Sequence, residues 1–114
     1  SVTGVQTCAL PIYAVLMPSR YEGVGLIALE AMLQGVTLVA TDAPGLREQL
    51  PPGHPWQARS GDAADFARVL QEVLDRPAAL APAVQTAREH VRARFSADAM
   101  LAAYAAQYAS LARR

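Results

Sequence analysis

A glycine-rich turn between two hydrophobic segments constrains the fold of this chain more than any other feature. An apolar run, Ala14–Met17, leads into the turn, and a helix-forming run follows from Leu26 to Leu33. A strand, a glycine turn and a helix start in this order leave free backbone N–H groups at a partially positive helix end, where an anion can bind. Glu22 lies before the turn and Glu30 lies after it, so carboxylates on both sides can accept hydrogen bonds from hydroxyl groups. Phosphate between two sets of hydroxyls describes a nucleotide sugar.

This segment resembles the donor site of the retaining GT-B glycosyltransferases of family four, the glycosyl transferases group 1. The family pattern is Glu, seven residues and Glu, usually with Gly-Phe-Gly after the first acid and Glu-Ala-Met at the second. The matching segments are Glu22-Gly23-Val24-Gly25, Glu30-Ala31-Met32, the strand-like Gln34–Thr41 and the Gly-x-x-Glu of Gly45–Glu48. Val24 and Thr37 replace the family's usual Phe and Pro. Since only backbone groups are needed at position 24, the replacement of Phe by Val24 is expected to alter the packing of the turn more than its chemistry.

The resemblance implies a role for each matching residue. It implies that the catalytic-site carboxylate of Glu22 binds the transferred sugar and that the amides of Gly23, Val24 and Gly25 hold this sugar. It also implies that the N–H groups of Leu26 and Ile27 bind the diphosphate and that Glu30 binds the ribose. The implied reaction moves a hexose from a nucleotide-diphosphate donor to an acceptor with retained configuration. The resemblance implies no metal and no cofactor, because amide dipoles and basic residues upstream would neutralise the leaving group. The chain alone is expected to be inactive.

Two other classes of function remain open. One is a GT-B sugar-nucleotide epimerase, which would share the nucleotide site but need no acceptor. The other is a non-catalytic α/β binding module in which Glu22 and Glu30 are surface acids. A glycosyltransferase and an epimerase would both bind a nucleotide sugar, whereas a non-catalytic binding module would not.

Apolar runs alternate with helical patterns along the chain, which predicts an α/β fold. Strands are expected at 13–17, 36–40 and 56–59. Helices are expected at 26–33, with Gly35 as C-cap, at 46–50 and over 80–91. Two further helices are expected, one from the N-cap Asp62 to Pro77 and one from the N-cap Ser96 to the C-terminus. The expected fold class is a three-layer, Rossmann-like parallel sheet, the C-terminal half of the second GT-B domain, with C-terminal helices. The first strand is expected to be buried, and to expose an apolar edge because it lacks a neighbour.

The last helix carries an apolar stripe. It consists of Met100, Leu101, Tyr104, Tyr108 and Leu111. In the resembling family the final helix crosses back onto an N-terminal domain, which this chain lacks. The alternative is that the stripe packs on the local sheet.

The first twelve residues are predicted not to be native. Val2–Ile12 matches, residue for residue, a translation of a widely used sequencing-library adapter. We therefore expect a division into residues 1–12, adapter-derived, and residues 13–114, a partial nucleotide-sugar-binding domain. Ser1 would then not be an initiator, and Cys8, the only cysteine, would not be native.

Composition narrows the remaining possibilities. Hydrophobic residues make up 53% of the 114 residues, which is ample for a folded core. Ten basic and ten acidic side chains cancel, so nucleic acid is not an expected partner. His54 and His90 lack metal-ligand spacing and are expected to be structural or solvated. The expected location is cytoplasmic, with peripheral attachment to the inner membrane face left open for the full-length protein.

Overall fold

A three-stranded parallel sheet lies at the centre of the computed structural model, which describes residues 12–23 and 25–113. The strands are β1 (Ala14–Met17), β2 (Thr37–Thr41) and β3 (Gln57–Ala58), in the spatial order β1-β2-β3. Ala14 pairs with Thr37, and Thr41 pairs with Ala58. All three strands therefore end at the same edge of the sheet. Residues 1–11 lie outside the described residues, so the adapter origin of residues 1–12 stays a prediction.

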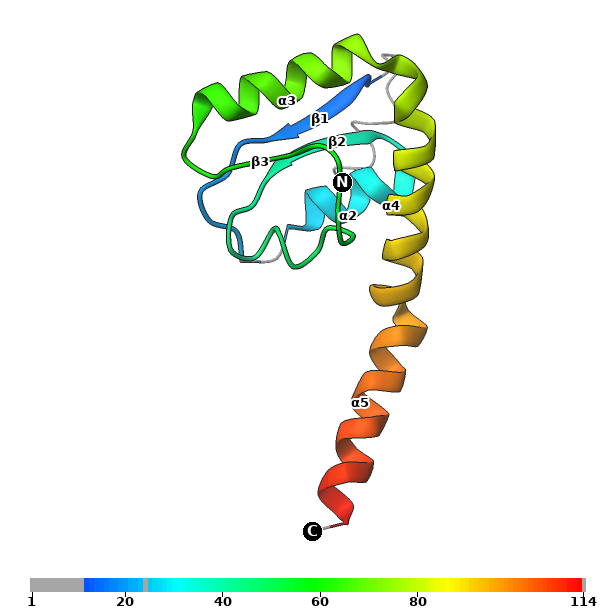
Figure 1. Cartoon of the computed structure of the whole chain (residues 1–114). Coiled ribbons are helices and arrows are strands. Elements are labelled where there is room, and N and C mark those ends of the chain that lie inside the picture. The colour runs from blue at the N-terminus through cyan, green and yellow to red at the C-terminus, as the bar shows by residue number, and fades with distance from the viewer. Residues whose placement is uncertain (1–11, 24, 114) are drawn as a thin grey trace.

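Helices cover both faces of the sheet. They are α2 (Leu26–Gln34), α3 (Ala63–Asp75), a short 3-10 helix (Pro77–Ala79), α4 (Leu80–Arg94) and α5 (Ala97–Ala112). α3 covers one face, and α2 with α4 covers the other (Figure 1). This arrangement gives the three layers that the alternating pattern predicts.

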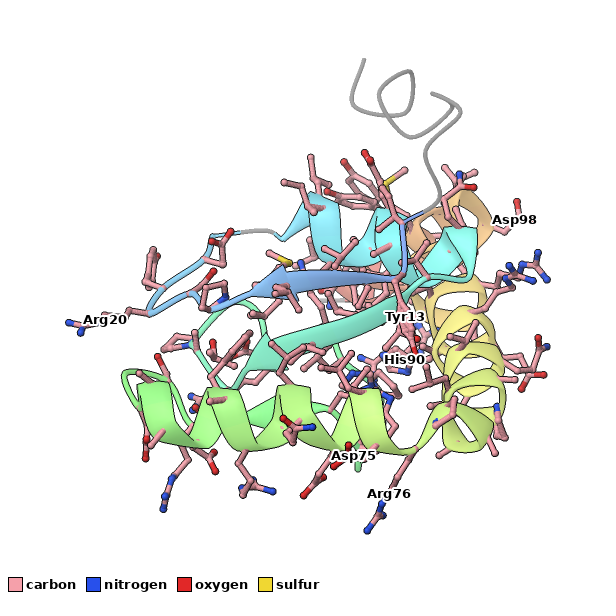
Figure 2. The ribbon with its side chains drawn as sticks, turned by 90° about the horizontal axis from the view of Figure 1, so that it is seen from above. Tyr13, Arg20, Asp75, Arg76, His90 and Asp98 are labelled. Carbon is pink, nitrogen blue, oxygen red and sulfur yellow. The ribbon has the colours of Figure 1, made fainter. Side chains whose placement is uncertain are left out.

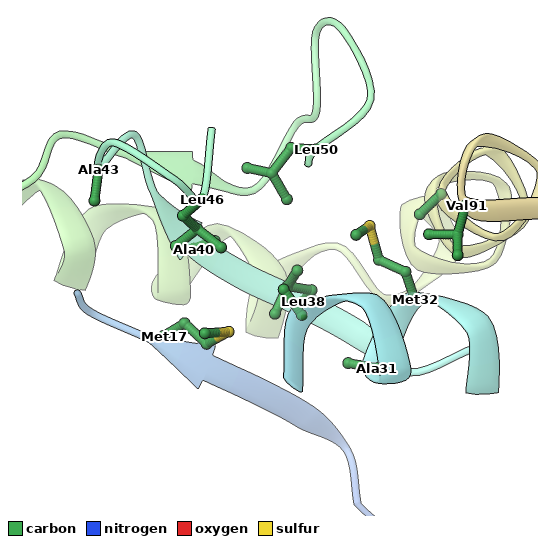
Figure 3. Close-up of a cluster of buried hydrophobic side chains, with 11 residues drawn as sticks. Met17, Ala31, Met32, Leu38, Ala40, Ala43, Leu46, Leu50 and Val91 are labelled. Carbon is green, nitrogen blue, oxygen red and sulfur yellow. The ribbon is translucent and has the colours of Figure 1, made fainter. Parts of the chain in front are cut away.

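The central strand explains why both faces need a helix. All five residues of β2 are buried. Because successive side chains point to opposite faces, Leu38 and Ala40 pack with α2, while Val39 packs with α3. Figure 3 shows Leu38 between Ala40 of the same strand and Met32 of α2 in the first of these clusters. A fully buried aliphatic side chain contributes about 1.5–3 kcal/mol, so β2 anchors both layers.

The predicted helix caps are confirmed. Gly35 ends α2 in a left-handed conformation with φ of 78°. The side chain of Asp62 accepts a hydrogen bond from the Asp65 N–H at the start of α3. The side chain of Ser96 accepts one from the Ala99 N–H at the start of α5. These contacts satisfy N–H groups that a helix end leaves without partners.

The helix predicted at 46–50 is wrong. The segment forms consecutive turns instead, in which the Leu46 N–H donates to the Ala43 carbonyl and the Gln49 N–H donates to the Leu46 carbonyl, each at 3.0 Å. Only five residues separate Gly45 from Pro51, and so short a run does not offset the cost of helix nucleation. Burial of Leu46, Gln49 and Leu50 fixes the turns in place.

The expectation that the first strand is buried is also wrong in part. Met17 is buried, but Leu16 is 46% exposed. Leu16 points to the opposite face from Met17, where α3 packs on β2 and β3 rather than on β1. Among the described residues, the outer edge of β1 has no strand partner, as the sequence predicts.

The final helix extends away from the sheet (Figure 1). The five residues of its apolar stripe are all exposed, and among the described residues α5 packs chiefly against α4. The alternative in which this stripe packs on the local sheet is therefore wrong. Its packing on an N-terminal domain stays a prediction. Within the described part of the chain, no helix has the length and apolar character needed to span a membrane.

Candidate donor site

The glycine turn lies at the carboxyl end of β1, where the chain passes into α2. Parallel sheets bind ligands outside the carboxyl ends of their strands, because helix N-termini and connecting loops meet there. Met17 ends β1, Leu26 begins α2, and the segment between them contains Glu22, Gly23 and Gly25. Val24 lies outside the described residues.

The carboxylate of Glu22 is held by Ser19. The Ser19 hydroxyl donates to Oε2 of half-buried Glu22 at 3.0 Å. The Ser19 carbonyl in turn accepts hydrogen bonds from Thr41 Oγ1 at 2.6 Å and from Ser60 Oγ at 3.1 Å. Thr41 ends β2, and Ser60 follows β3. Glu22 is thus connected to the ends of all three strands.

The turn after β2 fixes the backbone of the glycine turn. The Glu22 N–H donates to the Pro44 carbonyl at 3.0 Å. Gly45 has φ of +85°, and a Cβ there would lie 1.6 Å from the Glu22 carbonyl oxygen. Oε2 of Glu48 accepts from the Gly45 N–H at 2.7 Å. Backbone hydrogen bonds, from its own N–H and from that of Gly45, hold the pKa of Glu48 below its ordinary value of 4.5.

The N-terminus of α2 is open to an anion. Gly25 precedes the helix, and neither a capping side chain nor an acidic residue occupies the first turn. The N–H groups of Leu26 and Ile27 have no acceptor within the helix. A Cβ at Gly25 would lie 2.7 Å from Oε1 of Gln49, so that side of the turn is filled, whereas a Cβ at Gly23 would meet nothing within 4 Å. The turn therefore has a packed side at Gly25 and an open side at Gly23.

Glu30 lies in the second turn of α2. Its side chain is half-buried, and Oε2 is buried with no hydrogen-bond partner among the described residues. A buried carboxylate oxygen without a donor is costly, so a hydroxyl group that reached it would be bound favourably. An unpartnered carboxylate oxygen is compatible with the ribose-binding role that the family resemblance implies, and that role stays a prediction.

A pocket of about 170 Å³ lies at the carboxyl end of the sheet, next to the start of α3. It is lined by Pro18, Arg20, Thr41, Arg59, Gly61, Asp62, Ala63 and Phe66. Arg20 extends outward from the edge of the molecule (Figure 2). Arg59 forms ion pairs with Asp62 at 3.2 Å and Asp65 at 3.9 Å. In the described ranges, no three His, Cys, Asp or Glu side chains gather as a metal site would require.

Sequence reasoning missed three contributors to this edge of the sheet. It did not single out Ser19 or Ser60, and it placed Gly45 in a turn without predicting a contact with Glu22. It also missed Gln49, which is only 5% exposed and whose Oε1 has no partner among the described residues. The Gly-x-x-Glu pattern was the one available signal, and it marks Gly45 and Glu48 without showing what they contact.

Comparison with known proteins identifies the class of protein that this fold and turn define. Residues 8–90 match the Glycosyl transferases group 1 family. The chain belongs to this family.

Individual relatives of this chain are also glycosyltransferases or glycogen synthases by name. The glycogen synthase of Mycobacterium tuberculosis (strain ATCC 25618 / H37Rv) is 34% identical over 101 residues, covering 88% of this chain and 24% of the relative. A D-inositol 3-phosphate glycosyltransferase of Mycolicibacterium smegmatis is 41% identical over 96 residues, covering 79% of this chain and 21% of the relative. The chain therefore spans about a quarter of the length of the curated relatives it matches.

A solved structure gives the same answer for the fold. Sucrose-phosphate synthase from Thermosynechococcus elongatus superimposes with a TM-score of 0.74 at 30% identity, covering 87% of this chain and 25% of that one. The three-stranded sheet and its helices thus match part of a GT-B glycosyltransferase. The fold class expected from the sequence is confirmed.

Proposed function

We propose that this chain is the donor-binding part of a retaining family-four glycosyltransferase. The whole enzyme would move a hexose from a nucleoside-diphosphate sugar to an acceptor. The observation that carries the proposal is the glycine turn that enters the open N-terminus of α2, with Glu22 on one side and Glu30 on the other. Membership of the Glycosyl transferases group 1 family supports it.

Each part of the turn has one task in this proposal. The Glu22 carboxylate binds hydroxyls of the transferred sugar, and the amides of Gly23, Val24 and Gly25 hold that sugar. The N–H groups of Leu26 and Ile27 bind the diphosphate, while Glu30 binds the ribose. Hydrogen bonds to charged groups contribute about 1.5–3 kcal/mol each. As the bond to the sugar breaks, the helix N-terminus stabilises the charge that grows on the diphosphate, together with basic residues upstream and without a metal or cofactor.

The remaining parts of the enzyme would come from a longer chain. The exposed stripe on α5, and the edge of β1 that pairs with no strand among the described residues, are surfaces that further protein could cover. We propose that an N-terminal GT-B domain binds the acceptor, that α5 packs on this domain, and that the present chain alone is inactive. The enzyme would be cytoplasmic, or peripheral on the inner membrane face. The relatives include a glycogen synthase and a D-inositol 3-phosphate glycosyltransferase.

Donor binding by the full-length protein tests this function. UDP-glucose, GDP-mannose and the corresponding free nucleoside diphosphates would be titrated by calorimetry. Glu30→Gln should weaken both nucleotide sugar and free nucleoside diphosphate about tenfold, because it removes the charge that binds the ribose. Glu89→Gln, on the exposed side of α4, is the matched control and should change neither.

Three other results would replace parts of the proposal. Unchanged affinity in Glu30→Gln would remove the ribose assignment. Interconversion of donor sugars without an acceptor would indicate an epimerase. Failure of the full-length protein to bind any nucleotide sugar would indicate a non-catalytic module. Retention is read separately, from the anomeric configuration of the first product by NMR.

A further inference from the structure

Ser19 is the residue on which the three strand ends converge. Its hydroxyl donates to Glu22, and its carbonyl accepts from Thr41 and Ser60. We propose that Ser19 is a positioning residue that sets the direction of the Glu22 carboxylate for sugar binding. The proposal rests on the donor-site function above and adds to it a residue, and a source of support, that lie outside the two-glutamate pattern.

Separate hydrogen bonds fix the backbone and the side chain of Glu22. Its backbone N–H is bound by Pro44, which fixes where the residue lies. Its carboxylate is bound by Ser19 Oγ, which fixes where the side chain points. Because the side-chain torsions of a glutamate are otherwise free to rotate among staggered states, loss of the Ser19 hydroxyl would alter orientation without moving the turn.

Ser19 itself is held unusually firmly for a residue in a connecting loop. Two hydroxyl donors bind its one carbonyl oxygen, which uses both lone pairs. One donor, Thr41, is buried at the end of β2. The other, Ser60, is half-buried after β3 and is itself fixed, because its N–H donates to Oδ1 of Asp42 at 2.7 Å. The direction of Glu22 therefore depends on a turn about forty residues further along the chain.

The test compares a ligand that carries the sugar with one that lacks it. In the full-length enzyme, Ser19→Ala should weaken UDP-glucose or GDP-mannose binding about tenfold, or about 1.4 kcal/mol. UDP or GDP alone should bind as in the wild type, because the diphosphate and ribose contacts lie beyond Glu22. Ser19→Thr keeps the hydroxyl and should restore sugar binding.

Further variants separate positioning from folding. Ser60→Ala removes one of the two donors to the Ser19 carbonyl and should weaken nucleotide-sugar binding about threefold. Thr86→Val, which removes a hydroxyl from the exposed side of α4, is the control and should have no effect. Equal weakening of nucleotide sugar and free nucleoside diphosphate by Ser19→Ala would overturn the inference, because it would show that the whole turn had moved. Unchanged sugar affinity would overturn it as well. If the wild type binds the free nucleoside diphosphate but no nucleotide sugar, the proposed function fails before this inference is reached.

Discussion

Replacement of Gly45 by alanine tests how tightly the turn after β2 is fitted to the glycine turn. Gly45 has φ of +85°, and a Cβ there would lie 1.6 Å from the carbonyl oxygen of Glu22. Alanine therefore meets two separate penalties, one from backbone conformation and one from collision with a backbone atom. Because the collision is with main chain, no side-chain rotation relieves it.

The two penalties can be given magnitudes. The left-handed conformation costs an alanine about 1–2 kcal/mol relative to glycine. Relief of the collision must separate the two turns and break the bond from the Glu22 N–H to the Pro44 carbonyl, which costs a further ~0.5–1.5 kcal/mol. We expect Gly45→Ala to lower the free energy of unfolding by about 1.5–3.5 kcal/mol.

Gly53 supplies the matched control. It has φ of +73°, but a Cβ there would meet nothing within 4 Å. Gly53→Ala should therefore show the conformational penalty alone, about 1–2 kcal/mol. The difference between the two variants measures the contact between the turns.

Urea unfolding of the chain, fused to a soluble partner that lacks tryptophan, gives both values. Trp56 is the one tryptophan of the sequence and is 4% exposed in the folded domain, so its fluorescence reports unfolding. A linear extrapolation with an unchanged slope gives the change in stability. Equal losses for Gly45→Ala and Gly53→Ala would refute the reasoning, because the collision with Glu22 would then contribute nothing.

Three further predictions concern buried polar groups and a helix cap. Burial lowers the pKa of His54 in the folded chain below its ordinary value of 6.5. As the pH falls, the unfolded chain therefore binds a proton at His54 before the folded chain does, and the free energy of unfolding decreases below a pH of about 6.5. His54→Gln can keep the bond to the Leu38 carbonyl, and should reduce the loss of stability between pH 7.5 and 5.5; an unchanged pH profile would show that His54 does not cause it. Asp62→Ala removes the acceptor for the Asp65 N–H and should cost about 1 kcal/mol in urea unfolding, where no change would rule out the cap. Gln49→Met removes the unpartnered buried Oε1 at similar volume and should leave the melting temperature unchanged or higher; a fall of more than a few degrees would show that the amide has a partner.

Local sequence patterns predicted most of the secondary structure. The apolar run at Val36–Ala40 predicted β2, and Gly35, Asp62 and Ser96 marked helix ends that the structure confirms. These features are readable because a cap or a buried strand depends on residues within a few positions of one another. The Glu22 and Glu30 spacing is local in the same sense, and it placed the candidate site at the start of α2.

Contacts between distant segments were not predictable from the chain. Nothing in the sequence pairs Ser60 with Ser19, since no periodicity connects two loops that meet only when three strands align. The exposure of Leu16 likewise depends on where α3 crosses the sheet. The segment at 46–50 was misread because its apolar residues serve tertiary burial rather than a helical face.

The close fit of Gly45 against Glu22 has a consequence for protein engineering. Exchange of a connecting loop between homologues can alter specificity, because binding residues are concentrated on loops. Here the loop after β1 and the loop after β2 share a backbone contact in which one has no space for a side chain. A graft that imports either loop alone is expected to lose the match, so the two should be transferred together as one cassette.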